Sequence, residues 1–89
     1  MATQEQAKRA FIGWVAGAWE AEHNAPQDRD AVRGTAAAVF DKNPTRYSTI
    51  TAEEVGVLVE GPEDGRYAIP GIGKKYPELA RALRMLFDR

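Results

Sequence analysis

The residues best suited to chemistry lie in one short stretch of the C-terminal third. Gly71 and Gly73 stand one residue apart and are followed directly by Lys74 and Lys75. Glycines allow backbone N–H groups to approach an anion closely, and the two ammonium groups add positive charge. The spacing therefore predicts contact with phosphate, and these four residues form the candidate phosphate-binding set.

The same stretch resembles the hairpin of helix-hairpin-helix modules in DNA repair and replication proteins. The resemblance covers Ile69-Pro70-Gly71-Ile72-Gly73-Lys74-Lys75, seven of the 89 residues. It implies contact with the nucleic-acid backbone through the Pro-Gly-Ile-Gly turn and the following lysine, without readout of base sequence. This chain departs from the family pattern at Pro62 and Gly65, which interrupt the helix leading into the hairpin, and at Pro77, where the family has a small packing residue.

Charge is distributed unevenly along the chain. Residues 66–89 carry six basic and two acidic side chains, whereas residues 1–65 carry six basic and eleven acidic ones. Arg81 and Arg84 could extend a basic surface that faces phosphates. The competing interpretation is an ordinary solvated face, which suits a chain whose net charge is only −1.

Groups for catalysis are scarce. His23 is the only histidine, Glu20 precedes it by one helical turn, and the chain has no cysteine. A di-metal bundle would need a second Glu-x-x-His pair, although a single-metal site of Glu20, His23 and Asp28 stays an alternative. Ser48 has no histidine near it in sequence. We therefore expect no enzymatic activity, no catalytic residue, no cofactor and no metal site.

Length and composition indicate a single small globular domain over residues 1–89, with one modest core. The apolar run from Ala10 to Trp19 is too short to cross a bilayer, so we expect no membrane partner. Without cysteine there is no disulfide framework, which favours a reducing compartment, the cytoplasm.

The elements that must position these residues are helices. Apolar periodicity predicts helices over about 4–23, 27–41, 52–60 and 76–88. The third is the best defined, because Thr51 and Glu54 form a capping box signature. The fold class is therefore mainly α, a compact four-helix domain. Residues 46–50 and 66–69 share an Arg-Tyr start and are rich in β-formers, so a two-stranded β element is possible there.

The first predicted helix carries two tryptophans and a smooth strip. Trp14 and Trp19 are expected to be core or interface anchors. The strip consists of residues no larger than alanine, so a second helix, from this chain or from another subunit, could approach it closely. Its members are Ala10, Gly13, Gly17 and Ala21.

These observations favour a non-enzymatic interaction protein that contacts another protein or a second copy of itself, as a regulator or inhibitor of a larger complex. Tryptophan, tyrosine and arginine dominate binding hot spots. The candidate partner-binding residues are Trp14, Trp19, Tyr47, Tyr67, Arg81 and Arg84. The alternative is a nucleic-acid-associated protein that holds backbone phosphates through Gly71, Gly73, Lys74, Lys75 and the basic C-terminal helix.

Overall fold

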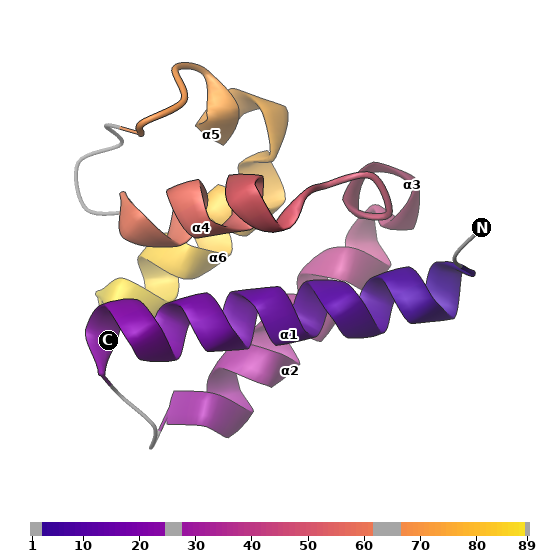
Figure 1. Cartoon of the computed structure of the whole chain (residues 1–89), viewed down its shortest axis with the longest axis horizontal. Helices are drawn as coiled ribbons and strands as arrows, with labels where there is room; N and C mark the ends of the chain where they lie inside the picture. Colours follow the sequence, from indigo (N-terminus) through magenta and orange to yellow (C-terminus); the bar gives the residue numbers. More distant parts are fainter. Residues whose placement is uncertain (1–2, 25–27, 62–66, 89) are drawn as a thin grey trace.

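Six helices make up most of the residues that the structure, a computed structural model, describes: 3–24, 28–61 and 67–88 (Figure 1). Four are long, namely α1 (Gln4–His23), α2 (Arg29–Lys42), α4 (Ala52–Glu60) and α6 (Pro77–Phe87). Two are single turns, α3 (Pro44–Tyr47) and α5 (Ile72–Lys75). The predicted mainly α, four-helix plan is therefore confirmed in outline, while the predicted start of the second helix at residue 27 lies outside the described residues.

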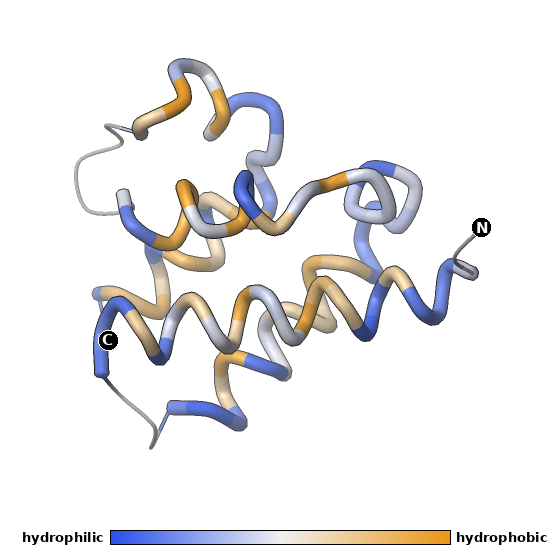
Figure 2. Tube along the Cα trace, viewed as in Figure 1, coloured by the Kyte–Doolittle hydropathy of each residue, from blue (hydrophilic) through white to orange (hydrophobic). Residues whose placement is uncertain are grey.

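Helix α1 begins at a capping box that the sequence analysis did not identify. The Gln6 N–H donates to Thr3 Oγ1 at 3.1 Å, and the Thr3 N–H donates to Gln6 Oε1 at 2.9 Å. Along α1, apolar and polar stretches recur with each helical turn, as expected when one face of the helix is apolar and the other is polar (Figure 2). The buried face carries Phe11, Val15 and Trp19, and it lies against α2 and α4 (Figure 1).

Helix α4 begins where the sequence predicted. The Glu54 N–H donates to Thr51 Oγ1 at 3.1 Å, and the Thr51 N–H donates to Glu54 Oε1 at 3.0 Å. Both bonds satisfy donors that a helix N-terminus leaves free. The helix then buries Val55, Leu58 and Val59.

The possible two-stranded β element is not supported. Residues 3–24, 28–61 and 67–88 contain no strand, and Arg66 lies outside them. In place of the first strand, Pro44 occupies the first turn of α3, and Asn43 Oδ1 accepts the Arg46 N–H at 3.3 Å. A proline and a side-chain cap start a helix, so β propensity, which depends strongly on context, is overridden here.

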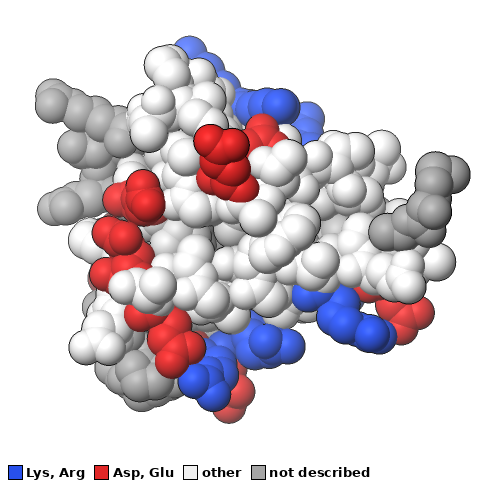
Figure 3. All heavy atoms as spheres, in the orientation of Figure 1, with Lys and Arg blue, Asp and Glu red and all other residues white. Residues whose placement is uncertain are grey.

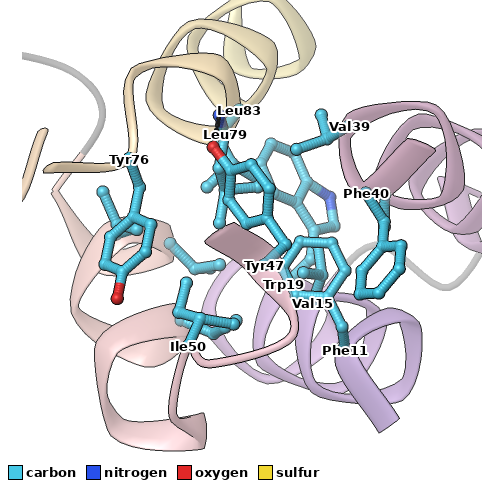
Figure 4. Close-up of a cluster of buried hydrophobic side chains, with 14 of the residues drawn as sticks. Phe11, Val15, Trp19, Val39, Phe40, Tyr47, Ile50, Tyr76, Leu79 and Leu83 are labelled. Atoms are coloured by element: carbon cyan, nitrogen blue, oxygen red, sulfur yellow. Dashed lines mark hydrogen bonds between the residues drawn. The ribbon is translucent and has the colours of Figure 1, made fainter. Parts of the chain in front are cut away.

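The core is a single cluster to which every helix contributes (Figure 4). Tyr47 lies near its centre, with its ring centroid 5.4 Å from that of Phe11 and 5.7 Å from that of Tyr76. The buried side chains are Phe11, Val15, Trp19, Val32, Ala36, Val39, Phe40, Tyr47, Ile50, Val55, Leu58, Val59, Ile72, Tyr76, Leu79 and Leu83. The one-turn helices α3 and α5 thus serve to bring a tyrosine from α3 and one that follows α5 into the core.

None of the helices within the described residues combines the length and the apolar character that crossing a membrane requires.

Candidate functional site

The two glycines of the candidate phosphate-binding set each have a role in the fold. Gly71 has φ +82°, a left-handed conformation that glycine adopts without steric cost, and its carbonyl accepts the N–H groups of Lys74 and Lys75 at 3.1 Å. A Cβ atom at Gly73 would lie 2.8 Å from Tyr67 Cε2, so this glycine makes room for a half-buried tyrosine ring.

The two lysines differ in their surroundings. Lys75 Nζ lies 3.1 Å from Glu54 Oε2 and 5.3 Å from the ring centre of Tyr76. The hydrogen bond with Glu54 and its charge raise the pKa of Lys75. Lys74 is exposed, and its ammonium group has no partner among the described residues. The structure therefore gathers all four candidates at one turn, and only Lys74 presents an unengaged charged group.

The surroundings of this turn also differ from the helix-hairpin-helix pattern. Residues 67–71, which lead into α5, form bends and turns instead of a helix. The helix that the family places immediately before its hairpin is therefore not formed over these residues.

Tyr47 links α3 to the first turn of α6. Its hydroxyl donates to Glu78 Oε1 at 2.8 Å and accepts the Leu79 N–H at 3.0 Å, so the oxygen points toward α6 (Figure 4). Burial, followed by the bond to Glu78, raises the pKa of Tyr47. The pKa of Glu78 is lowered by its own backbone N–H, then by Tyr47, with help from Arg46 at 3.4 Å.

Tyr76 makes the matching link to the first turn of α4. Its hydroxyl lies 3.1 Å from both carboxylate oxygens of Glu54. Burial and then Glu54 raise the pKa of Tyr76. Burial acts to raise the pKa of Glu54 as well, but hydrogen bonds from Thr51, Lys75 and Tyr76 outweigh it and hold that pKa below its ordinary value.

The aromatic partner-binding candidates are placed very differently from one another. Trp19 is 4% exposed and Tyr47 only 1%, so both lie in the core, whereas Trp14 is 38% exposed at the edge of the buried face of α1. Tyr67 is half-buried against Gly73. Of these four, only Trp14 offers substantial surface to a partner.

None of the described helices covers the smooth strip of α1. Its four residues are exposed, and a Cβ atom at Gly13 or Gly17 would meet nothing within 4 Å. In the view of Figure 3 charged side chains gather toward the two ends of α1 and leave the middle uncharged. Close packing within the chain therefore does not explain these glycines.

His23 and Glu20 do not converge on a shared ligand position. The ring centroid of His23 lies 4.1 Å from that of Trp19, with the ring planes tilted by 45°, and the buried His23 Nε2 has no hydrogen-bond partner among the described residues. Glu20 is bound by Arg29, 3.0 Å away. Within the described ranges, no group of three or more histidine, aspartate and glutamate residues could hold a metal ion.

A groove between α2 and α6 is the surface feature that sequence reasoning missed. It consists of two adjoining hollows, each about 320 Å³, that share Ala82 and Met85. Met85 is 66% exposed, the most exposed of the large apolar side chains described. The α2/α6 groove is lined by Thr35, Val39, Lys42, Pro77, Glu78, Arg81, Ala82, Met85 and Leu86. A usable signal was present in the sequence, because Met85 lies outside the apolar face of α6.

The charged residues of the α2/α6 groove gather at one end. Lys42 and Arg81 are exposed, and their side chains form no ion pair or hydrogen bond with a described residue. Glu78 lines the same hollow and is bound by Tyr47 and Arg46. Arg84 does not line the groove, and its side chain lies 3.7 Å from Asp88. Arg81 is thus the one predicted partner-binding residue that lines the groove.

No protein-family model, no curated protein and no solved structure matches this chain.

Proposed function

We propose that this protein is a non-enzymatic interaction protein that binds a segment of another protein, and that the α2/α6 groove is its docking surface. The observation that carries the proposal is Met85, a large apolar side chain that is 66% exposed in a groove whose lining also includes the apolar residues Val39, Ala82 and Leu86. Methionine is flexible and polarizable, and it is common on surfaces that adapt to a partner.

The groove offers more to a partner than the outer face of α1. Val39, Ala82 and Leu86 are already partly or wholly buried, so a side chain docked beside Met85 would contact apolar atoms on several sides. Such pockets, closed to water on binding, are where hot spots occur. The strip of α1 has only alanine and glycine around Trp14, and it buries little apolar area on contact.

The nucleic-acid alternative has less support. Gly71, Gly73 and Lys75 each have a role within the fold, which leaves Lys74 as the member of the set whose side chain has no partner among the described residues. On the basic C-terminal helix, Arg81 lines the α2/α6 groove and Arg84 lies 3.7 Å from Asp88. Lys74 alone contributes one phosphate contact, whereas backbone binding usually requires several.

The test compares the wild-type protein with Met85→Asp and Ala21→Asp as baits in the same cell extract, with bound proteins identified by mass spectrometry. Both substitutions add one carboxylate at an exposed helical position, but Ala21 lies on α1, away from the groove. We expect a discrete protein that wild type and Ala21→Asp retain and Met85→Asp loses. Retention by all three proteins would contradict the groove as docking surface, and recovery of nucleic acid alone would favour the alternative.

A further inference from the structure

We propose that the occupant of the α2/α6 groove is an amphipathic helix of a partner protein that carries carboxylates at one end of its apolar face. The inference rests on the proposed function, because it specifies the chemistry of the segment that docks there.

Backbone chemistry favours a helix as the occupant. The groove walls are α2 and α6, whose backbone groups are mostly bonded within their own helices. An extended peptide gains affinity by adding to an exposed sheet edge, and the described residues contain no strand to supply one. A docked helix satisfies its own backbone and needs only side-chain pockets.

The dimensions suit a short helix. From Glu78 to Leu86 the groove follows α6 for about 12 Å, slightly more than two helical turns. A helix that presents apolar side chains at i, i+4 and i+7 spans nearly the same length. Its central side chain would lie against Ala82 and Met85, which line both hollows.

The charge of the groove is polarised along its length. Lys42, Glu78 and Arg81 line the hollow at the N-terminal end of α6, whereas Thr35, Ala82, Met85 and Leu86 line the other. Because Tyr47 and Arg46 already engage Glu78, the two cations are the unpaired charges of this end. Electrostatic complementarity therefore calls for carboxylates at that end of the occupant, and it sets the direction in which the helix lies.

The same charges argue against a second copy of this chain as occupant. A two-fold dimer would place the groove of one copy on that of the other, each residue meeting the same patch. If the two-fold axis runs along the groove, Lys42 and Arg81 of both copies lie close together, and juxtaposed like charges oppose association. If the axis crosses the groove, the cationic end of each copy faces the apolar end of the other and meets no carboxylate there. A partner with a different, acidic surface meets no such repulsion.

The experiment uses the full chain and helical peptides of about 12 residues with leucine at i, i+4 and i+7. One peptide has two glutamates at one end, a second has glutamines there, and a third has lysines. Met85 and Met1 are the two methionines of the chain, so ¹³C-methyl labelling gives a reporter inside the groove. Fluorescence anisotropy of the labelled peptides gives the affinities.

We expect the glutamate peptide to bind, to shift the Met85 methyl signal, and to bind about tenfold more tightly than the glutamine peptide. The double variant Lys42→Glu, Arg81→Glu should remove this preference. The matched control, Arg33→Glu, Lys74→Glu, makes the same change of net charge at exposed cations elsewhere and should keep it.

Each other outcome has a definite meaning. Equal binding of the glutamate and glutamine peptides, unchanged in the double variant, would overturn the acidic partner and leave the docking surface intact. A methyl signal that no peptide shifts would overturn the helix as occupant, while the bait comparison with Met85→Asp would still decide the proposed function. A shift that follows protein concentration alone would identify a second copy as the occupant, and so overturn the inference.

Discussion

The turn at residues 69–75 and the α6 wall of the α2/α6 groove lie in the same third of the chain, and the turn and the groove both combine apolar residues with cations. At the turn, Glu54 from α4 binds Lys75, Tyr67 covers Gly73, and Gly71 supplies the left-handed residue that starts α5. In the groove, Met85 and the cations Lys42 and Arg81 have no such partners among the described residues. Contacts within the fold therefore engage most of the functional groups of the turn, whereas those three side chains of the groove stay free to bind a partner.

This difference shows that residue type and spacing indicate which ligands a side chain could bind. Whether that side chain is free to bind them depends on neighbours that are distant in sequence. Lys75 is engaged by a carboxylate 21 residues before it. The carboxylate of Glu54 partly neutralises the charge of the Lys75 ammonium group, so the attraction of Lys75 for a phosphate is reduced. Predictions that contrast the turn with the groove follow, ordered by expected effect.

The largest difference in the free energy of unfolding should appear between the variants Tyr76→Ala and Met85→Ala. Tyr76 is 2% exposed and Met85 is 66% exposed. Truncation of a buried aromatic residue costs about 3–5 kcal/mol, whereas truncation of an exposed side chain usually changes the free energy of unfolding by less than about 0.5 kcal/mol. Urea unfolding followed by circular dichroism measures both. Similar losses in the two variants would mean that the groove, too, is needed for folding.

Removal of the hydroxyl group should lower the free energy of unfolding at Tyr47 but not at Tyr67. Tyr47→Phe leaves the buried Leu79 N–H without its acceptor and deprives Glu78 of a donor, so we expect a loss of about 1.5–3 kcal/mol. Tyr67→Phe is the control, because the Tyr67 hydroxyl has no hydrogen-bond partner among the described residues. Its unfolding midpoint in urea should stay close to that of wild type. An equal loss in Tyr67→Phe would show that the link to α6 is not the cause.

Two glycine substitutions should change stability in opposite directions. Gly71→Ala forces an alanine to φ +82° and should cost about 1–2 kcal/mol. Gly34→Ala, in the interior of α2 where an added Cβ meets nothing within 4 Å, should stabilise by about 0.5–1 kcal/mol. Thermal unfolding of the two variants provides the comparison. A stable Gly71→Ala protein would show that the turn tolerates another conformation.

Stability should be nearly constant around neutral pH and should decline at strongly acidic and strongly alkaline pH. The pKa values of Glu54 and Glu78 are lowered in the fold, so their contribution is complete above the unfolded value of about 4.3 and is lost as the pH falls through the folded values. The pKa values of Tyr47 and Tyr76 are raised, so their contribution is lost as the pH rises above about 10. Unfolding midpoints in urea, measured across the pH range, test both losses of stability. In Glu78→Gln the loss of stability at acidic pH should be smaller than in wild type.

The smallest effect is expected at the turn itself in a nucleic-acid binding assay. Because Lys75 is held by Glu54 and only Lys74 is free, we expect fluorescence anisotropy to detect no binding of duplex or single-stranded DNA at about 50 mM salt. The double variant Lys74→Glu, Lys75→Glu should then behave like wild type. Salt-sensitive binding that this variant loses would restore the phosphate-binding hypothesis.

Sequence reasoning located the helices better than it located the surfaces. The capping box at Thr51 and Glu54 was predicted correctly because both partners lie within one helical turn. The strand expected at 46–50 was wrong, since Asn43 and Pro44 start a helix there. The buried face of α1 includes Trp19 and leaves Trp14 at its edge, a distinction that helical periodicity alone did not make.

The sequence by itself determined the helical fold class, the ends of the best-capped helices and the supply of charged and aromatic side chains, because these depend on residues within a few positions of one another. Only the tertiary structure decided which side chains stay available. Glu54 and Glu78 meet Tyr76 and Tyr47 from more than twenty residues away, and the α2/α6 groove exists only where two separate helices lie together. Contacts between distant residues depend on how whole helices pack, and local patterns do not encode that packing.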